Sequence, residues 1–313
     1  MRYHTYLKDT AKVSEIGVGA WQLGESTEWE SMSEEEAVEL VRKALDLGVN
    51  FFDTAPNYGL GTSELRLGKG LKGSDRDKIV LNTKFGHAAS GEKNYDPGAI
   101  RESLEGSLRR LGTDHVDSLI LHNPPIEYLD GNKTDTYEVL EKLVGEGKIQ
   151  AYGASVDTFE EMKLLLDTTG SKVVEAFYNI LFQDIARAFD QALRQEVAVI
   201  AKIPLDSGWL GGKYTAETAF DDIRKRWSQQ DKATRAALVA QLKERIPEGI
   251  PLPSAAIAFC LAHEAVSTVI PGNKNLGQLE SNVASAGVEL PPEVLEGLRQ
   301  FYLEQVQPLH LPW

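Results

Sequence analysis

The chain of 313 residues has a single cysteine, no long hydrophobic run and fewer basic than acidic residues, and each scarcity excludes a class of protein. Because Cys260 is alone, no intramolecular disulfide and no cysteine-rich zinc site can form, and we expect no metal. No apolar stretch approaches the ~20 residues of a membrane-spanning helix, so we expect no membrane association. Residues 1–8 lack the apolar core of a secretory signal, which favours a cytoplasmic location.

The balance of charge is acidic. Asp and Glu number 47 against 33 Lys and Arg, a formal net charge of −14. A protein that binds the phosphate backbone of nucleic acid needs a basic face, so we expect no nucleic-acid partner. The remaining composition, with 42% hydrophobic and 26% charged residues, is that of an ordinary globular protein. A small-molecule substrate is the expected partner, and the chain could be a monomer or a homo-oligomer.

Glycines near the start of the chain do not form a dinucleotide-binding fingerprint. Gly17 and Gly19 have the first spacing of that motif, but Gln22 stands where its third glycine belongs. No helix pattern opens at this point either. We therefore reject a Rossmann fold.

Short apolar runs alternate with amphipathic helical patterns along the whole chain. The expected strands are residues 14–24, 49–53, 78–84, 116–122, 149–154, 173–178, 197–203 and 266–270. The expected helices are residues 33–48, 63–72, 97–111, 135–145, 158–168, 184–195, 254–263, 275–286 and 292–304. Eight strand–helix alternations without a linker-like tract predict an α/β fold, a single-domain (β/α)8 TIM barrel over residues 1–313.

Three segments lie outside this alternation. Residues 1–12 are expected to form an N-terminal arm or hairpin, and residues 205–247 a polar, partly helical insertion after the seventh strand. Residues 292–313 are expected to form a C-terminal helix and tail. The end of the tail, residues 306–313, is unusually apolar for a terminus. It either folds over the barrel or another subunit, or it is disordered.

Polar side chains stand where successive strands end. Asp53 follows the apolar run 49–52, and Tyr58 lies on the Pro- and Gly-containing loop just beyond it. Lys84 ends the third strand and His122 the fourth. Each residue alone has an ordinary structural explanation, such as a helix cap or a solvated charge on the rim. The carboxyl ends of all strands of a parallel barrel meet at one mouth, however, and four such groups there indicate chemistry.

A lysine and an aspartate beside a tyrosine have a definite chemical use. The Lys84 ammonium favours phenolate and is expected to lower the pKa of Tyr58 from ~10. Asp53 would hold the lysine, and His122 would donate a hydrogen bond to a substrate carbonyl oxygen. Such a set could protonate an alkoxide as it forms, or take a proton from an alcohol in reverse.

With these residues in place, the chain resembles the aldo-keto reductases, in particular their short-loop bacterial-type members. The resemblance implies a TIM barrel, a nicotinamide cofactor held without a Rossmann fold, and reversible carbonyl–alcohol interconversion. It also implies that Tyr58 is the general acid, tuned by Lys84 and Asp53, and that His122 orients the carbonyl. The motifs that carry it are Gly19-Ala20-Trp21, the run from Phe52 to Gly59 with Ser63-Glu64, Lys84, Leu121-His122, Pro204-Leu205 with Gly208 and Leu210 to Lys213, and Ile270-Pro271-Gly272 through Gln278-Leu279 to Asn282.

The barrel's phosphate site is expected after strands seven and eight, where loop amides and a helix start face an anion. The resemblance implies NADP(H), with NAD(H) as the alternative, because Lys274 could bind a ribose 2′-phosphate or could be a solvated charge at a helix start. Gln278 stands where many members have an arginine, which leaves this preference open. The full set of expected cofactor contacts is Ser155, Glu175, Lys202, Leu205, Gly208, Leu210, Lys213, Gly272, Asn273, Lys274, Gln278 and Asn282.

Three positions depart from the family pattern around the nicotinamide. Val156 replaces an asparagine, Glu175 a glutamine, and Lys202 an aromatic residue that stacks on the ring. We expect Lys202 to pair with Glu175 or with a cofactor phosphate. Since all four catalytic residue types are present, altered cofactor binding is expected and not lost chemistry.

The substrate pocket is expected to be lined by Trp21, Phe85 and His87, with Tyr128 as a further candidate. Three functions stay open. The first is an NAD(P)H-dependent reductase of aldehydes and ketones, and the second an aldose 1-dehydrogenase working on NAD(P)+. The third is a weakly catalytic nucleotide-sensing subunit, as the potassium-channel β subunits of this superfamily suggest.

Overall fold

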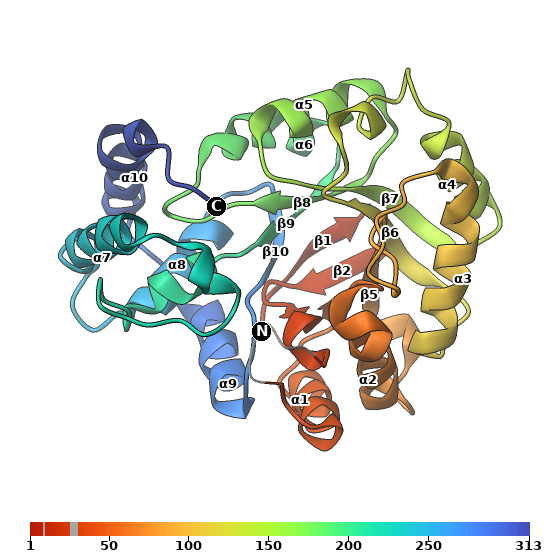
Figure 1. Ribbon diagram of the computed structural model, residues 1–313, viewed down its shortest axis with the longest axis horizontal. Helices are drawn as coiled ribbons and strands as arrows, with labels where there is room; N and C mark the ends of the chain where they lie inside the picture. Colours follow the sequence, from red (N-terminus) through yellow and green to blue (C-terminus); the bar gives the residue numbers. More distant parts are fainter. Residues whose placement is uncertain (9, 26–30) are drawn as a thin grey trace.

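The computed structural model describes residues 1–8, 10–25 and 31–313, and parallel strands form a nearly closed barrel surrounded by helices (Figure 1). The strands of the barrel sheet follow one another in sequence order from β3 to β10, all in parallel register. Their bounds are β3 Val18–Gly19, β4 Phe51–Asp53, β5 Val80–Phe85, β6 Val116–His122, β7 Ile149–Val156, β8 Val173–Phe177, β9 Ala198–Lys202 and β10 Val266–Ile270. Parallel bridges from Ile16 to Val269 and from Gly19 to Gly272 join the first and last strands. The predicted (β/α)8 barrel is confirmed.

Helices on the outside of the barrel follow its strands, and all but α9, which comes after the last strand, lie between two of them. Their bounds are α1 Glu34–Asp46, α2 Thr62–Leu71, α3 Ile100–Leu111, α4 Thr136–Gly145, α5 Phe159–Thr168, α6 Phe189–Arg194, α8 Leu252–Leu261 and α9 Leu276–Ala284. A capping box starts α1, where Ser33 and Glu36 bind each other's backbone N–H groups. The apolar stripe of α1 is buried against the barrel. Within the described ranges, no helix is long and apolar enough to cross a membrane.

An antiparallel hairpin closes the amino-terminal end of the barrel. It consists of β1 Tyr3–Leu7 and β2 Ala11–Ser14, red in Figure 1, and lies across the barrel. Its buried side chains Tyr6, Leu7 and Val13 pack on a cluster that includes Phe51 and Val80, the first residues of β4 and β5. Burial of these apolar groups fixes the hairpin on the barrel.

The first barrel strand is much shorter than predicted. The sequence predicted a strand over residues 14–24, but β3 has only two residues, and Ala20–Leu23 form a 3-10 turn. Carbonyl groups of this turn bind side chains of α2, since Ser63 Oγ donates to Ala20 O at 2.6 Å and Arg66 Nη1 to Leu23 O at 2.7 Å. These contacts replace the ladder that would have continued the strand, and Trp21 therefore lies on a turn.

The insertion and the tail meet at the carboxyl end of the barrel. The insertion contains two 3-10 turns, Asp206–Gly211 and Ile223–Arg226, and the helix α7 Gln229–Lys243. From α7, Arg235 Nη2 donates to the carbonyl oxygen of Pro312 at 2.6 Å. After α10 Pro292–Phe301, the tail ends with the ring centroid of Trp313 4.7 Å from that of Phe177 at the end of β8. Of the alternatives left open by the sequence, the structure shows a tail folded over the barrel.

Candidate active site

The four predicted catalytic residues lie together at the carboxyl end of the barrel. Asp53, Lys84 and His122 occupy the carboxyl-terminal ends of the neighbouring strands β4, β5 and β6. Tyr58 follows β4 in a short turn. The Nζ of Lys84 is 5.2 Å from the centroid of the Tyr58 ring, and the rings of Tyr58 and His122 are 5.7 Å apart, edge to face.

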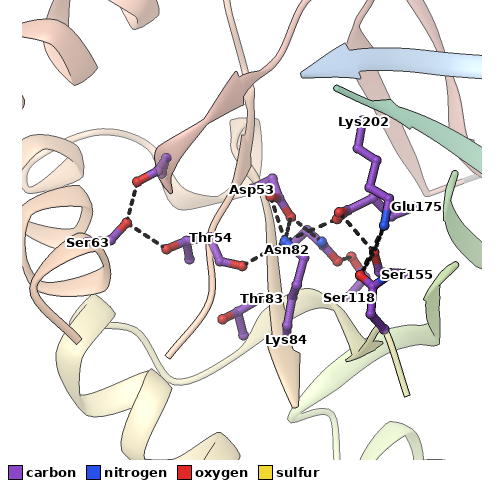
Figure 2. Close-up of polar contacts among 12 residues, drawn as sticks. Asp53, Thr54, Ser63, Asn82, Thr83, Lys84, Ser118, Ser155, Glu175 and Lys202 are labelled. Carbon is purple, nitrogen blue, oxygen red and sulfur yellow. Dashed lines mark hydrogen bonds and ion pairs between the residues drawn. The ribbon is translucent and has the colours of Figure 1, made fainter. Parts of the chain in front are cut away.

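The Lys84 ammonium is fully buried and binds two carboxylates. Its Nζ lies 2.6 and 2.7 Å from the two carboxylate oxygens of Asp53, and 3.1 Å from Oε2 of Glu175 (Figure 2). Burial acts against the ammonium, but the charges of Asp53 and Glu175 outweigh it and raise the pKa of Lys84. The sequence assigned Glu175 to the cofactor or to a pair with Lys202, and not to Lys84. Its contact with Lys84 was missed because β5 and β8 are not neighbours in the sheet.

The arrangement around Lys84 changes the pKa of the Asp53 carboxyl. Burial and the nearby Glu175 carboxylate raise the pKa of Asp53 to about 7, although Lys84 and Asn82 act to lower it. Two carboxylates thus share one buried cation, and the pair holds a proton more readily than an isolated aspartate would.

Tyr58 differs from the sequence prediction in one respect. Burial raises the pKa of the Tyr58 phenol above its usual value, and the Lys84 ammonium opposes this only in part. The predicted lowering of this pKa is wrong for the ligand-free protein, because desolvation outweighs the neighbouring cation. The phenol therefore stays protonated at neutral pH. It remains able to protonate an alkoxide, which is a far stronger base than phenolate.

His122 is held as a neutral imidazole. Burial, assisted by the charge of Lys84, lowers its pKa well below 6.5. Its ring stacks on that of His87 at a centroid distance of 4.4 Å, and the Tyr95 hydroxyl donates to its backbone carbonyl at 2.5 Å. Among the described residues, Nδ1 of His122 is buried without a hydrogen-bond partner. This nitrogen has hydrogen-bonding capacity that the protein leaves unused.

A chain of hydrogen bonds that the sequence did not reveal connects Asp53 to the hairpin at the amino-terminal end of the barrel. Asn82 Nδ2 donates to Asp53 Oδ1 at 2.6 Å, and Ser118 Oγ donates to Asn82 Oδ1 at 2.6 Å. The hydroxyl of Tyr6, from the hairpin, lies 2.6 Å from Ser118 Oγ. One signal for Asn82 was available, because it precedes Lys84 by two residues on one strand and so points to the same side.

A second lysine sits beside this centre. Nζ of Lys202 lies 2.7 Å from Asp157 Oδ1 and donates to Ser155 Oγ at 2.8 Å. The single hydrogen of the Ser155 hydroxyl has two acceptors in reach, Asn123 Oδ1 at 3.1 Å and Glu175 Oε1 at 3.2 Å, so Lys202 is linked to Glu175 through the serine and not directly (Figure 2). The predicted direct pair between Lys202 and Glu175 is therefore wrong.

The sequence analysis also did not predict that two further side chains contact Lys202. Asp157 follows β7 directly, and Asn123 follows β6 and accepts from Lys202 Nζ at 3.0 Å through Oδ1. Both stand immediately after a strand, which is the same signal that found Asp53. With Lys202 in place, Ser155 and Asn123 are already used as acceptors of its hydrogen bonds.

The segment after β9, where the sequence predicted part of a phosphate site, has a tightly turned backbone. Asp206, Ser207 and Gly208 have positive φ angles of 46°, 50° and 96° in succession. The carbonyl of Leu205 accepts from the N–H groups of Gly208 and Leu210 at 2.8 and 3.1 Å. A Cβ on Gly208 would lie 2.9 Å from the Tyr214 ring, so a side chain is excluded there. Further along, Lys213 is exposed.

The segment after β10 presents polar groups at the start of α9. Gln278 Oε1 accepts from the backbone N–H of Lys274 at 2.8 Å, and Asn275 caps the helix by accepting from Gln278 N at 2.9 Å. Lys274 itself is exposed, as is Gly272. Asn282 Nδ2 donates to Asn273 Oδ1 at 2.8 Å, so these two predicted contacts hold the loop together.

These two segments fit the phosphates of a nicotinamide dinucleotide, and the ring end of the site is more acidic. An exposed lysine and a capped helix start are suitable donors for an anion. At the other end, Glu175 offers only acceptor atoms, close to Lys84 and Tyr58. The residues present therefore fit the cofactor. Near the nicotinamide, the Glu175 carboxylate stands where the family pattern has a glutamine side chain.

The residues predicted to line a substrate pocket lie in different surroundings. The Trp21 ring lies 6.4 Å from that of Tyr58, and His87 stacks on His122 as described. Tyr128 packs against Tyr95 at 5.5 Å. Phe85 is 2% exposed and belongs to the hydrophobic core behind Tyr95. In the part of the chain that the structure describes, no three His, Cys, Asp or Glu side chains converge as metal ligands do.

Comparison with known proteins finds relatives along almost the whole chain. The model of the Aldo/keto reductase family matches residues 15–302. L-Galactose dehydrogenase of Arabidopsis thaliana is 31% identical over 284 residues, covering 88% of this chain and 84% of that enzyme. NADH-specific methylglyoxal reductase of Escherichia coli (strain K12) is 26% identical over 299 residues, covering 89% and 91%.

The similarity extends to three dimensions. The holo form of an aldo-keto reductase from Bacillus halodurans is similar with a TM-score of 0.81 and 28% sequence identity, and the match covers 96% of each chain. The sequence matches and the structural match thus both cover the barrel whose strand ends carry Asp53, Lys84 and His122. The resemblance predicted from those residues is confirmed, and the chain belongs to the aldo/keto reductase family of oxidoreductases.

Proposed function

We propose that this protein interconverts a carbonyl compound and its alcohol with a nicotinamide dinucleotide, using Tyr58 as the proton donor and acceptor. The observation that carries the proposal is the convergence of Tyr58, Lys84 and His122 at one barrel mouth, with Lys84 anchored on Asp53. A small carbonyl compound or sugar is the class of substrate that such a site would bind.

The protonation state of each side chain in the site determines its proposed role. Neutral His122 would donate a hydrogen bond to the carbonyl oxygen and polarise it. Protonated Tyr58 would then give its proton to the oxygen as negative charge develops there. Lys84 would stabilise the phenolate left behind. The bound cofactor would supply the hydride.

NADP(H) remains our proposal for the cofactor, with NAD(H) as the alternative. Exposed Lys274 at the start of α9 is suited to bind a 2′-phosphate. Against this, Gln278 is engaged with the Lys274 backbone, and one relative is an NADH-specific reductase. A cytoplasmic location also remains a proposal, and the single, buried Cys260 suits a reducing compartment.

A second candidate is oxidation of an aldose on NAD(P)+. L-Galactose dehydrogenase, a relative at 31% identity, supports it, and the same tyrosine serves both directions. A weakly catalytic nucleotide-sensing subunit is the third candidate, and it predicts tight dinucleotide binding with negligible turnover.

One experiment separates these functions. Purified protein is titrated with NADPH, NADH, NADP+ and NAD+, and then assayed with a panel of aldehydes and ketones and a panel of aldoses. Reduction of carbonyls faster than oxidation of sugars supports the first candidate, and the reverse ratio supports the second. Binding without turnover on either panel supports the third. Failure to bind any dinucleotide would overturn the proposed function.

A further inference from the structure

Resting on the proposed function, we propose that Glu175 makes this site bind the oxidised nicotinamide dinucleotide in preference to the reduced one, through its charge. The oxidised and reduced cofactors differ by one positive charge on the nicotinamide ring. For hydride to reach a carbonyl carbon whose oxygen is bound by Tyr58, that ring must lie within a few ångströms of the substrate. It must therefore lie close to the buried charges around Lys84.

These charges do not cancel. Asp53 and Glu175 share the single ammonium of Lys84, at 2.6 and 3.1 Å. The second ammonium, that of Lys202, is matched by the carboxylate of Asp157 at 2.7 Å. The connected cluster therefore contains three carboxylates and two ammonium groups, and carries one negative charge in excess when all are ionised.

The excess charge is assigned to Glu175 by the geometry. Asp53 makes two short contacts with Lys84, and Asp157 is paired with Lys202, so each ammonium has its own close partner. Glu175 adds one longer contact to Lys84, and it shares the hydrogen of the Ser155 hydroxyl with Asn123 Oδ1. It is 3% exposed, so solvent screens it weakly. An uncompensated carboxylate in such a place attracts a cationic ring by at least about tenfold in affinity over a neutral ring.

A proton is coupled to this preference. The pKa of Asp53 is raised to about 7 by burial and by Glu175, so below this pH the two carboxylates hold one proton and the excess charge is absent. Affinity for the oxidised form should then rise as the pH rises through about 7, while affinity for the reduced form stays level. Binding of the oxidised form near pH 7 should release a proton.

The tyrosine, histidine and lysine side chains that face this pair from β1, β5, β6 and the loop after β4 do not titrate in the same range. The pKa values of Tyr58 and Tyr6 are raised by burial, and that of His122 lies well below 6.5. Lys84 stays charged because its pKa is raised. The remaining charged side chains, Lys202 and Asp157, form an ion pair across Ser155 from Glu175.

The test compares dinucleotide binding by the unmodified protein, Glu175→Gln and Glu196→Gln. Glutamine keeps the shape of the side chain and removes its charge. Glu196 is a matched control, because it is exposed and precedes β9 at the opposite end of the barrel. Dissociation constants for the oxidised and reduced forms of the tighter-binding cofactor are measured by calorimetry between pH 6 and pH 8.5, in two buffers of different ionisation enthalpy. The difference between buffers counts the protons released.

Glu175→Gln should lower the ratio of oxidised to reduced affinity about tenfold or more, and should abolish both its pH dependence and the proton release. Glu196→Gln should change neither. Lys202→Met provides a second variant with the opposite expectation, an increased ratio, should Glu175→Gln fold poorly. An unchanged ratio in both site variants overturns the inference while leaving the proposed function intact. Failure of the unmodified protein to bind either form overturns the proposed function itself.

Discussion

The hydroxyl of Tyr58 is the group on which the proposed proton transfer depends. Tyr58→Phe removes this proton and keeps the ring beside Lys84 and His122. We expect turnover to fall by about 10²- to 10⁴-fold, since this is the usual contribution of a positioned acid. Affinity for the dinucleotide, measured by titration, should change little. Tyr3→Phe is the control. The Tyr3 side chain is exposed at the start of β1, so this substitution should leave turnover unchanged. Near-full turnover in Tyr58→Phe would contradict the assigned role.

Lys274 decides the proposed preference for a 2′-phosphate. The side chain is exposed at the start of α9. Lys274→Ala should therefore lower the affinity for NADPH about tenfold, which is the scale of one charge-assisted contact, and leave the affinity for NADH unchanged. Titration with both reduced cofactors measures the difference. Lys72→Ala, which changes an exposed lysine outside the predicted cofactor contacts, tests whether the effect is specific to the position. Equal losses for NADPH and NADH would show that Lys274 does not contact a 2′-phosphate.

At the residue scale, sequence reasoning succeeded where a residue's place in a strand determines its role. Asp53, Lys84 and His122 could be placed at one mouth because parallel strands share a carboxyl edge. The pKa of Tyr58 could not be predicted, since the extent of burial depends on the whole barrel and overrides the sign of the neighbouring charge. The contact of Glu175 with Lys84 crosses the barrel interior, and no local pattern in the sequence reports it.

At the scale of elements, the junction between the loop after β9 and α7 depends on one buried ion pair. Arg235 Nε lies 3.1 Å from Asp206 Oδ2, and both side chains are fully buried. Arg235 also holds the carbonyl of Pro312 and lies over the Trp227 ring. This pair therefore joins the predicted phosphate loop, the insertion and the C-terminal tail.

Arg235→Met should lower the free energy of unfolding by about 3–5 kcal/mol, because it leaves the Asp206 carboxylate buried without a cation. Urea denaturation measures the loss. The double variant Asp206→Asn with Arg235→Met removes both charges and should recover a large part of it. Arg245→Met changes an exposed arginine near the end of the same helical segment and should cost much less. Equal losses in the single and double variants would show that the ion pair is not the origin of the effect.

Elements with strong local signals were the best predicted. The strands 116–122 and 266–270 have the predicted bounds, since each is a short, almost entirely buried run in which apolar residues predominate. The first strand was predicted too long, because its later residues bind Ser63 and Arg66 of α2, and those contacts depend on tertiary structure. The tail was undecidable from sequence for the same reason, since its partners Phe177 and Arg235 are distant in the chain.

At the scale of the whole molecule, the hairpin closes the amino-terminal end of the barrel, and the end of the tail packs beside the carboxyl end of β8 (Figure 1). A line of hydrogen bonds runs between the two ends, from Tyr6 through Ser118 and Asn82 to Asp53. Ser118 has one hydroxyl hydrogen and donates it to Asn82. The Tyr6 hydroxyl must therefore be the donor to Ser118, and the donors point toward the Asp53 carboxylate.

Tyr6→Phe tests how much this line contributes apart from packing. The ring of Tyr6 packs on Phe51 at 5.3 Å and is retained, so only the hydrogen bond to Ser118 is lost. Because Ser118 loses a donor and keeps its own bond to Asn82, we expect a loss of about 0.5–1.5 kcal/mol in the free energy of unfolding. Tyr6→Ala also empties a buried site and should cost about 3–5 kcal/mol. Chemical denaturation of both variants, with exposed Tyr3→Phe as a control within about 0.5 kcal/mol of the unmodified protein, separates the two contributions. If Tyr6→Phe costs as much as Tyr6→Ala, the hydrogen-bond line and not the packed ring holds the hairpin on the barrel.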